Sequence, residues 1–167
     1  MEWLRVLRHL AMPAWRLRQA LPRATLQAIE AAIGASERAH GGQICFAVET
    51  ALDLVPLVRG QSARERALEV FAQLRVWDTE HNNGVLIYLL LAERAIEIVA
   101  DRGLARQVAP AQWEALIAGM REAFRAGRFE EGLVQAVDAV DGLLRQHYPL
   151  QSGQTNPNEL PDVADLR

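Results

Sequence analysis

The chain has 167 residues, of which 50% are hydrophobic, so it is long and apolar enough to bury the core of one domain. Its net charge of −3 provides no basic field for nucleic acid, and its single cysteine excludes an internal disulfide bond. No apolar run approaches the ~20 residues that a membrane-spanning helix needs.

Residues 1–21 form an amphipathic, cationic segment ahead of the main domain. Its apolar residues recur at helical spacing, and Pro13 is expected to break the helix. Two interpretations remain open. Trp and Leu opposite Arg suit a helix that lies at a membrane surface, and they also suit a helix that packs on the domain or on a second copy of the chain. The apolar residues are Trp3, Leu4, Leu7 and Leu10.

A secretory signal peptide is not expected, because the N-terminus lacks a continuous apolar core and a small-residue cleavage site. We therefore predict a cytoplasmic protein. Residues 1–21 are the feature that would hold it at the inner membrane as a peripheral protein. The sequence leaves the oligomeric state open.

The predicted domain covers residues 22–150 and mixes helices with strands. Ser62 and Glu65 form a capping box that opens one of the helices. Residues 151–167 are polar and contain several prolines, so we expect a mobile tail there. The predicted elements are helix 22–40, strand 43–52, helix 62–74, strand 85–91, strand 95–100, helix 110–126 and helix 129–147.

This order predicts an α/β fold with a mixed β-sheet, flanked by α-helices on both faces. The first two strands and the helix between them form a βαβ unit, whose strands should be parallel. The second and third strands are separated by three residues and form a hairpin. The start of the first two strands and the end of the third therefore meet at one end of the sheet, where we expect the functional site.

Polar side chains with oxygen atoms gather at that end of the predicted sheet. Asp78, Glu80 and Asn82 precede the second strand, and Asp101 follows the third. Carboxylate and amide oxygens are the ligands that hard cations such as Ca²⁺ prefer. The pattern fits a site for Ca²⁺ or another divalent cation. The alternative, which also remains open, is that Asp78 and Asn82 only stabilise turns through bonds to the backbone.

The stretch RVWDTEHNNGVLIYLLLAERAIEIVADRGL, residues 75–104, resembles the TPM domain family, also called the TPM phosphatase domain. The Asn-Asn-Gly that leads into one strand and the Asp-Arg-Gly that ends the next are its most specific features. GQICFAVE and FRAGRFEEGLVQAVDAVDGLL extend the likeness to residues 22–149. The resemblance implies an α/β domain from a family with acid phosphatases, calcium-binding proteins and proteins linked to membrane-protein maintenance.

Two hypotheses for the function follow. In the first, the chain is a metal-dependent phosphate-ester hydrolase. Asp78, Glu80 and Asp101 would hold the divalent ion, and Arg102 would neutralise the charge that develops on the phosphate. In the second, the chain is a non-catalytic module that docks on a membrane or on a membrane protein. This hypothesis rests on the cationic Trp/Leu segment at the N-terminus and on the lack of any recognised catalytic motif, such as Cys-x5-Arg.

Overall fold

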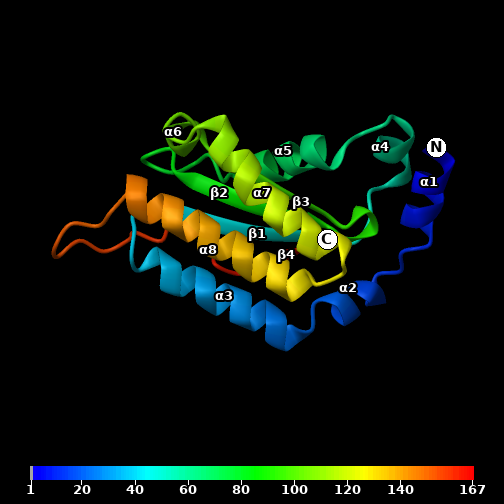
Figure 1. Ribbon diagram of the computed structural model, residues 1–167, viewed down its shortest axis with the longest axis horizontal. Helices are drawn as coiled ribbons and strands as arrows, with labels where there is room; N and C mark the ends of the chain where they lie inside the picture. The colour runs from blue at the N-terminus through cyan, green and yellow to red at the C-terminus, as the bar shows by residue number, and fades with distance from the viewer. Residues whose placement is uncertain (1) are drawn as a thin grey trace.

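The computed structural model describes residues 2–167, with side chains from Trp3 onward. Its centre is a four-stranded sheet with the strand order β3-β2-β1-β4 (Figure 1). The strands are β1 (Gln43–Glu49), β2 (Gly84–Leu90), β3 (Ala95–Ala100) and β4 (Asp165–Leu166). β1 runs parallel to β2 and to β4, whereas β3 pairs with β2 in the antiparallel sense.

The mixed sheet, its βαβ unit and its hairpin are confirmed. β1 and β2 are joined through α4 (Leu54–Val58) and α5 (Ala63–Gln73), which form the crossover. The hairpin turns through a short 3₁₀ helix, Leu91–Glu93, and Arg94 closes it with a left-handed φ of 48°. Every residue of β2 is buried, because helices cover both faces of the sheet.

Two helical layers enclose the sheet (Figure 1). One face packs against α3 (Arg23–Glu37), α7 (Pro110–Arg125) and α8 (Phe129–His147), around side chains such as Ile44, Ile87 and Phe124. The other face packs against α4 and α5. Alternate residues of each strand supply the two cores, as the period of a β-strand requires.

A local signal in the sequence explains the start of α5. Ser62 accepts a hydrogen bond from the backbone of Glu65 and receives the Glu65 side chain in return, so the predicted capping box opens α5. Two short helices were not predicted. The five residues of α4 lie where a loop was expected, and α6 (Arg102–Ala105) begins where Asp101 caps the chain leaving β3.

The N-terminal segment forms two helices, α1 (Glu2–Leu10) and α2 (Trp15–Ala20), with Pro13 in the break between them. Leu17 and Leu21 are buried against the core of the domain. Within residues 2–167, no helix combines the length and the apolar character needed to cross a bilayer.

The C-terminal segment differs from the mobile tail that its composition suggested. β4 pairs with β1 through Ala47 and Val48, and the amide of Arg167 donates to the carbonyl of Val48 at 2.8 Å. Leu160 is buried against the face covered by α5. These contacts use mainly backbone groups and one apolar side chain, so they leave no periodic pattern in the sequence.

Candidate functional site

Polar groups converge at the end of the sheet where β1 and β2 begin and β3 ends. The loop that joins α5 to β2 passes over this end, and its residues Thr79 and Asn83 are buried. The backbone amide of Asp101 donates to the carbonyl of Gly84 at 2.8 Å, which ties the exit of β3 to the start of β2. The sheet topology thus brings the loop and Asp101 together, as the sequence predicted.

Asp101 carries a buried carboxylate with one oxygen unpartnered. The side chain is 7% exposed. Its Oδ1 accepts a hydrogen bond of 2.7 Å from the backbone N–H of Arg102, at the start of α6. Its Oδ2 is buried and has no hydrogen-bond partner among residues 2–167. A buried acceptor without a donor destabilises the fold by about 1–3 kcal/mol, more when it is charged.

Asn83 presents a second buried oxygen of the same kind. Its side-chain Nδ2 donates to the carbonyl of Gly41 at 2.8 Å, and its backbone N–H donates to Oγ1 of Thr79 at 3.1 Å. These bonds fix the amide, while its Oδ1 has no partner in the described part of the chain. Gly84 follows Asn83 directly, and its carbonyl accepts the hydrogen bond from the backbone N–H of Asp101. The two unpartnered oxygens therefore lie at the same end of the sheet.

Backbone carbonyls add to this oxygen-rich region. The carbonyl of Asn82 accepts a hydrogen bond from the N–H of Gly103 at 2.9 Å, and Asn82 itself has a φ of 50°. A Cβ on Gly103 would lie 2.4 Å from the carbonyl oxygen of Asn82, 2.7 Å from that of His81 and 2.8 Å from the hydroxyl of Tyr148. Gly103 is therefore required for the close approach of these oxygens.

A cleft of about 870 Å³ opens beside these groups. Its walls include Glu80, Asn83, Gly103 and Tyr148. Burial raises the pKa of Tyr148, the charge of Asp101 raises it further, and a hydrogen bond from Gln107 partly offsets both effects. The influence of Asp101 on Tyr148 links the buried carboxylate to the cleft.

The residues predicted from the sequence occupy different positions around this cleft. Asp101 is buried beside it, and Glu80 lies on its wall with an exposed side chain. Asp78 and Arg102 are exposed and do not line it. Asn82 contributes its backbone carbonyl oxygen to this end of the sheet, where it accepts from Gly103. Within residues 2–167, no three His, Cys, Asp or Glu side chains come close enough together to hold a metal without other ligands.

Sequence reasoning placed Gly41 and the loop with Asn83 at this end, but it assigned no site role to the side chains of Asn83, Gln107 and Tyr148. Asn83 is adjacent to a predicted residue, and its position directly before a buried strand is the signal that could have identified it. Gln107 and Tyr148 come from segments far away in the sequence, and no local pattern marks them.

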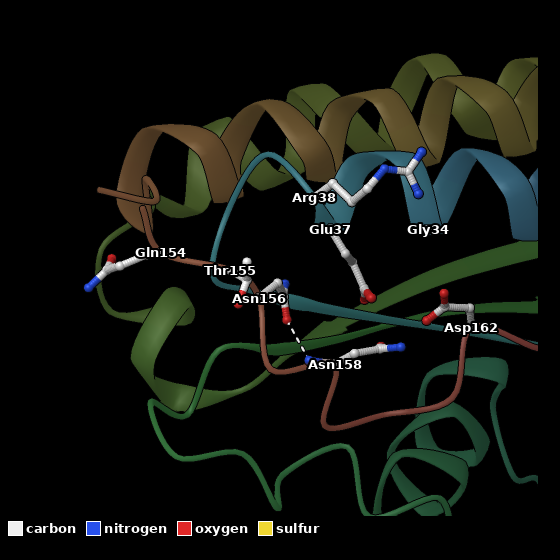
Figure 2. Close-up of a pocket in the computed structure, with 8 residues that line it drawn as sticks. All are labelled: Gly34, Glu37, Arg38, Gln154, Thr155, Asn156, Asn158 and Asp162. Atoms are coloured by element: carbon white, nitrogen blue, oxygen red, sulfur yellow. Dashed lines mark hydrogen bonds between the residues drawn. The ribbon is translucent and has the colours of Figure 1, made fainter. Parts of the chain in front are cut away.

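A second cleft, of about 370 Å³, lies between α3 and the C-terminal segment (Figure 2). Glu37 is buried there and accepts a hydrogen bond of 2.7 Å from the backbone N–H of Ile44. With its amide nitrogen facing the acids, Asn158 donates to Glu37 and Asp162 at 3.1 Å each. Burial raises the pKa of Glu37 to about 8; the Ile44 N–H opposes this and Asp162 adds to it. The protonated Glu37, on α3, thus binds the C-terminal segment through Asn158.

We predict that Glu37 makes the stability of the fold depend on pH. The folded chain keeps this proton up to about pH 8, whereas the unfolded chain releases it near its ordinary value of 4.5. The stabilisation is therefore complete below pH 4.5 and is lost as the pH rises to about 8, by roughly 1.4 kcal/mol for each pH unit between these values. Urea unfolding at several pH values should show this decline in the native chain and a flatter profile in Glu37→Gln. Parallel profiles would contradict the prediction.

Comparison with known proteins agrees with this architecture. Among curated proteins, no sequence matches the chain. The BA42 protein from the psychrophilic bacterium Bizionia argentinensis is 25% identical, with a TM-score of 0.75 over 88% of this chain and 95% of that one. An N-terminal domain of a protein from P. gingivalis has the same fold, at 20% identity and a TM-score of 0.60 over 84% of this chain and 94% of that one. The family model described as the TPM domain matches residues 17–143, and the chain therefore belongs to the TPM domain family.

Proposed function

We propose that this chain is a divalent-cation-dependent phosphate-ester hydrolase whose cation is held by Asp101 and Asn83. The supporting observation is the pair of buried, unpartnered oxygens, Oδ2 of Asp101 and Oδ1 of Asn83. Each oxygen has lost water without gaining a donor within residues 2–167, and a cation would supply the missing interaction. Ca²⁺ and Mg²⁺ take carboxylate, amide and backbone carbonyl oxygens.

The protein holds these candidate ligands in place through neighbouring groups. The backbone N–H of Arg102 orients the Asp101 carboxylate, and the carbonyl of Gly41 orients the Asn83 amide. Glu80 on the cleft wall, and Asp78 further out, would add negative charge around the cation. When bound, a divalent cation would act as a Lewis acid toward a phosphate ester and offset its negative charge.

The cleft is large enough for a small phosphate ester. Its volume of about 870 Å³ falls within the usual range for small-molecule sites. Tyr148 has a raised pKa and therefore keeps its hydroxyl proton near neutral pH, so it can donate a hydrogen bond to a phosphate oxygen. Arg102 follows Asp101 and is exposed outside the cleft lining, so its guanidinium would have to turn toward the cleft to neutralise charge that develops on the phosphate.

Turnover of an aryl phosphate tests this proposal. Activity should require Mg²⁺ or Ca²⁺, should stop with EDTA, and should fall at least about 100-fold in Asp101→Asn. Asp138→Asn is the matched control, because Asp138 is an exposed aspartate on α8 and should leave activity unchanged. Activity that survives both EDTA and Asp101→Asn would indicate a contaminant and would contradict the proposal.

A cation-binding module without turnover is the second candidate. The exposure of Asp78 and Glu80 favours this candidate. Of the three acids predicted as ligands, Asp101 alone is buried beside the cleft. Titration calorimetry separates the two candidates. Cation binding that Asp101→Asn abolishes, together with no turnover of any phosphate ester, would support the module and exclude the hydrolase.

A further inference from the structure

The helix α1 is oriented with its apolar side toward solvent. Trp3, Leu4, Leu7 and Leu10 are 73%, 68%, 52% and 66% exposed. Residues at this spacing lie on one side of a helix, so together they form an apolar stripe. A helix that packs on a soluble domain normally buries such a stripe. The packing of α1 on the domain therefore does not explain why one side of this helix is apolar.

Polar contacts hold the opposite side of α1 on the domain. Arg5 donates to Oε1 of Glu93 from Nε at 2.7 Å, and its Nη2 donates to the carbonyl of Gln61 at 2.5 Å. His9 is buried; its Nε2 lies 2.9 Å from Glu93, and its Nδ1 accepts from the backbone N–H of Leu52 at 2.9 Å. Because Nδ1 is an acceptor, Nε2 carries the proton and donates to Glu93. These bonds fix the orientation of the apolar stripe.

The neighbouring helix α4 extends the apolar surface. α1 and α4 contact each other and lie at the same end of the molecule (Figure 1). Leu54, Val55 and Val58 of α4 are exposed as well. We call these three residues and the stripe on α1 the outer apolar face. Exposed apolar side chains gathered on two contacting helices are typical of an interaction site.

Among the described side chains, most charged ones around the outer apolar face are arginines, although the whole chain has a net charge of −3. Arg8 on α1 and Arg59 after α4 are exposed beside it. Arg16 and Arg18 are exposed on the adjoining α2, and the Arg16 guanidinium lies 5.8 Å from the ring centre of Trp15. Asp53, which precedes α4, is an exposed acid in the same region. The arginines outnumber it.

We propose that the outer apolar face binds the surface of an anionic lipid bilayer. Trp and Leu residues would enter the boundary between headgroups and acyl chains, and the surrounding arginines would contact anionic headgroups. α1 has nine residues and α4 has five, so each lies along the surface rather than across it. A two-fold contact between copies would bring the same arginines together, and their repulsion disfavours that occupant.

This surface is separate from the proposed cation site. The family match begins at residue 17, so α1 lies outside it. α1 packs against the turn between β2 and β3, whereas the cleft lies at the other end of these strands. Failure of either proposal would leave the other unaffected.

Co-sedimentation of the full chain with lipid vesicles tests the proposal. The chain should bind phosphatidylcholine vesicles that contain phosphatidylglycerol more tightly than vesicles of phosphatidylcholine alone. The double variant Leu4→Ser/Leu7→Ser should bind at least about tenfold more weakly, because two leucines no longer leave water. Leu68→Ser is the matched control, since Leu68 is also exposed but lies on α5. Arg8→Glu should weaken binding only to the anionic vesicles.

Three results would overturn the proposal: no binding of the native chain to anionic vesicles, equal binding by the double variant, or a dimer in sedimentation equilibrium that the double variant abolishes while neither protein binds vesicles. The last result would identify a second copy as the occupant. All substituted side chains are exposed in the structure, and a thermal melt of each variant verifies its fold. Trp3 offers an independent measurement, because brominated acyl chains should quench more fluorescence in the native chain than in Trp3→Phe.

Discussion

Replacing Gly84 by alanine should destabilise the fold by about 4 kcal/mol, above the usual range for an overpacked site. A Cβ at Gly84 would lie 2.0 Å from the backbone carbonyl oxygen of Val76 and 2.9 Å from its Cγ1. A backbone oxygen held between α5 and β2 cannot turn away as the end of a flexible side chain can. The substitution should therefore move the loop over the candidate site or separate it from the sheet. Chemical denaturation of Gly84→Ala measures the loss.

Gly142→Ala is the control for this experiment. Gly142 lies inside α8, and no atom would come within 4 Å of a Cβ there. Alanine is favoured over glycine in a helix interior, so this variant should be more stable than the native chain by about 0.5–1 kcal/mol. If Gly84→Ala were as stable as the native chain, the close approach of Val76 would not be the reason for glycine at this position.

The central hairpin could be predicted from the sequence because its signals are local and strong. β2 is a dense apolar run, β3 is another, and Glu93 and Arg94 mark the turn between them. β2 is buried on both faces, so it carries no alternation and still stands out by its apolar character. The helices α7 and α8 show clear apolar stripes, and α8 spans the predicted residues.

The elements that the sequence did not reveal are short or depend on distant partners. β4 has two residues and exists because the edge of β1 offers unpaired backbone groups at Ala47 and Val48. The Asn156 side chain donates to the carbonyls of His40 and Gly42, so the C-terminal segment is held by polar contacts to a loop more than a hundred residues away. Such contacts follow from the fold and have no periodicity of their own.

The candidate site was predictable in its location and only partly in its residues. The topology alone places Asp101 next to the loop before β2, and the structure agrees. Which side chains of that loop point inward depends on its backbone. The left-handed φ of Asn82 directs its carbonyl toward Gly103, and the amide of Asn83 is the one that is buried. A sharp bend in a loop decides which of two neighbouring side chains is buried, and sequence spacing does not reveal such a bend.

A divalent cation should stabilise the folded chain, by about 2.7 kcal/mol at a hundredfold excess over its dissociation constant. Only the folded form brings Asp101 and Asn83 to the same end of the sheet, so the cation binds the unfolded chain weakly. For a chain of this length the gain corresponds to a rise of roughly 5–10 °C in melting temperature. Thermal melts with EDTA, with millimolar Mg²⁺ and with millimolar Ca²⁺ measure it.

Asp101→Asn makes this prediction sharper, because its effect should have opposite signs with and without the cation. Asparagine can still cap α6, as the Asp101 side chain does through Arg102. In EDTA the variant should be at least as stable as the native chain, since it removes a buried charge whose Oδ2 is unpartnered within residues 2–167. With the cation it should be less stable, because its melting temperature should no longer rise. Asp78→Asn, at an exposed position, should respond to the cation almost as the native chain does. A native chain whose melting temperature is the same in all three solutions would show that Asp101 and Asn83 serve the fold and hold no cation.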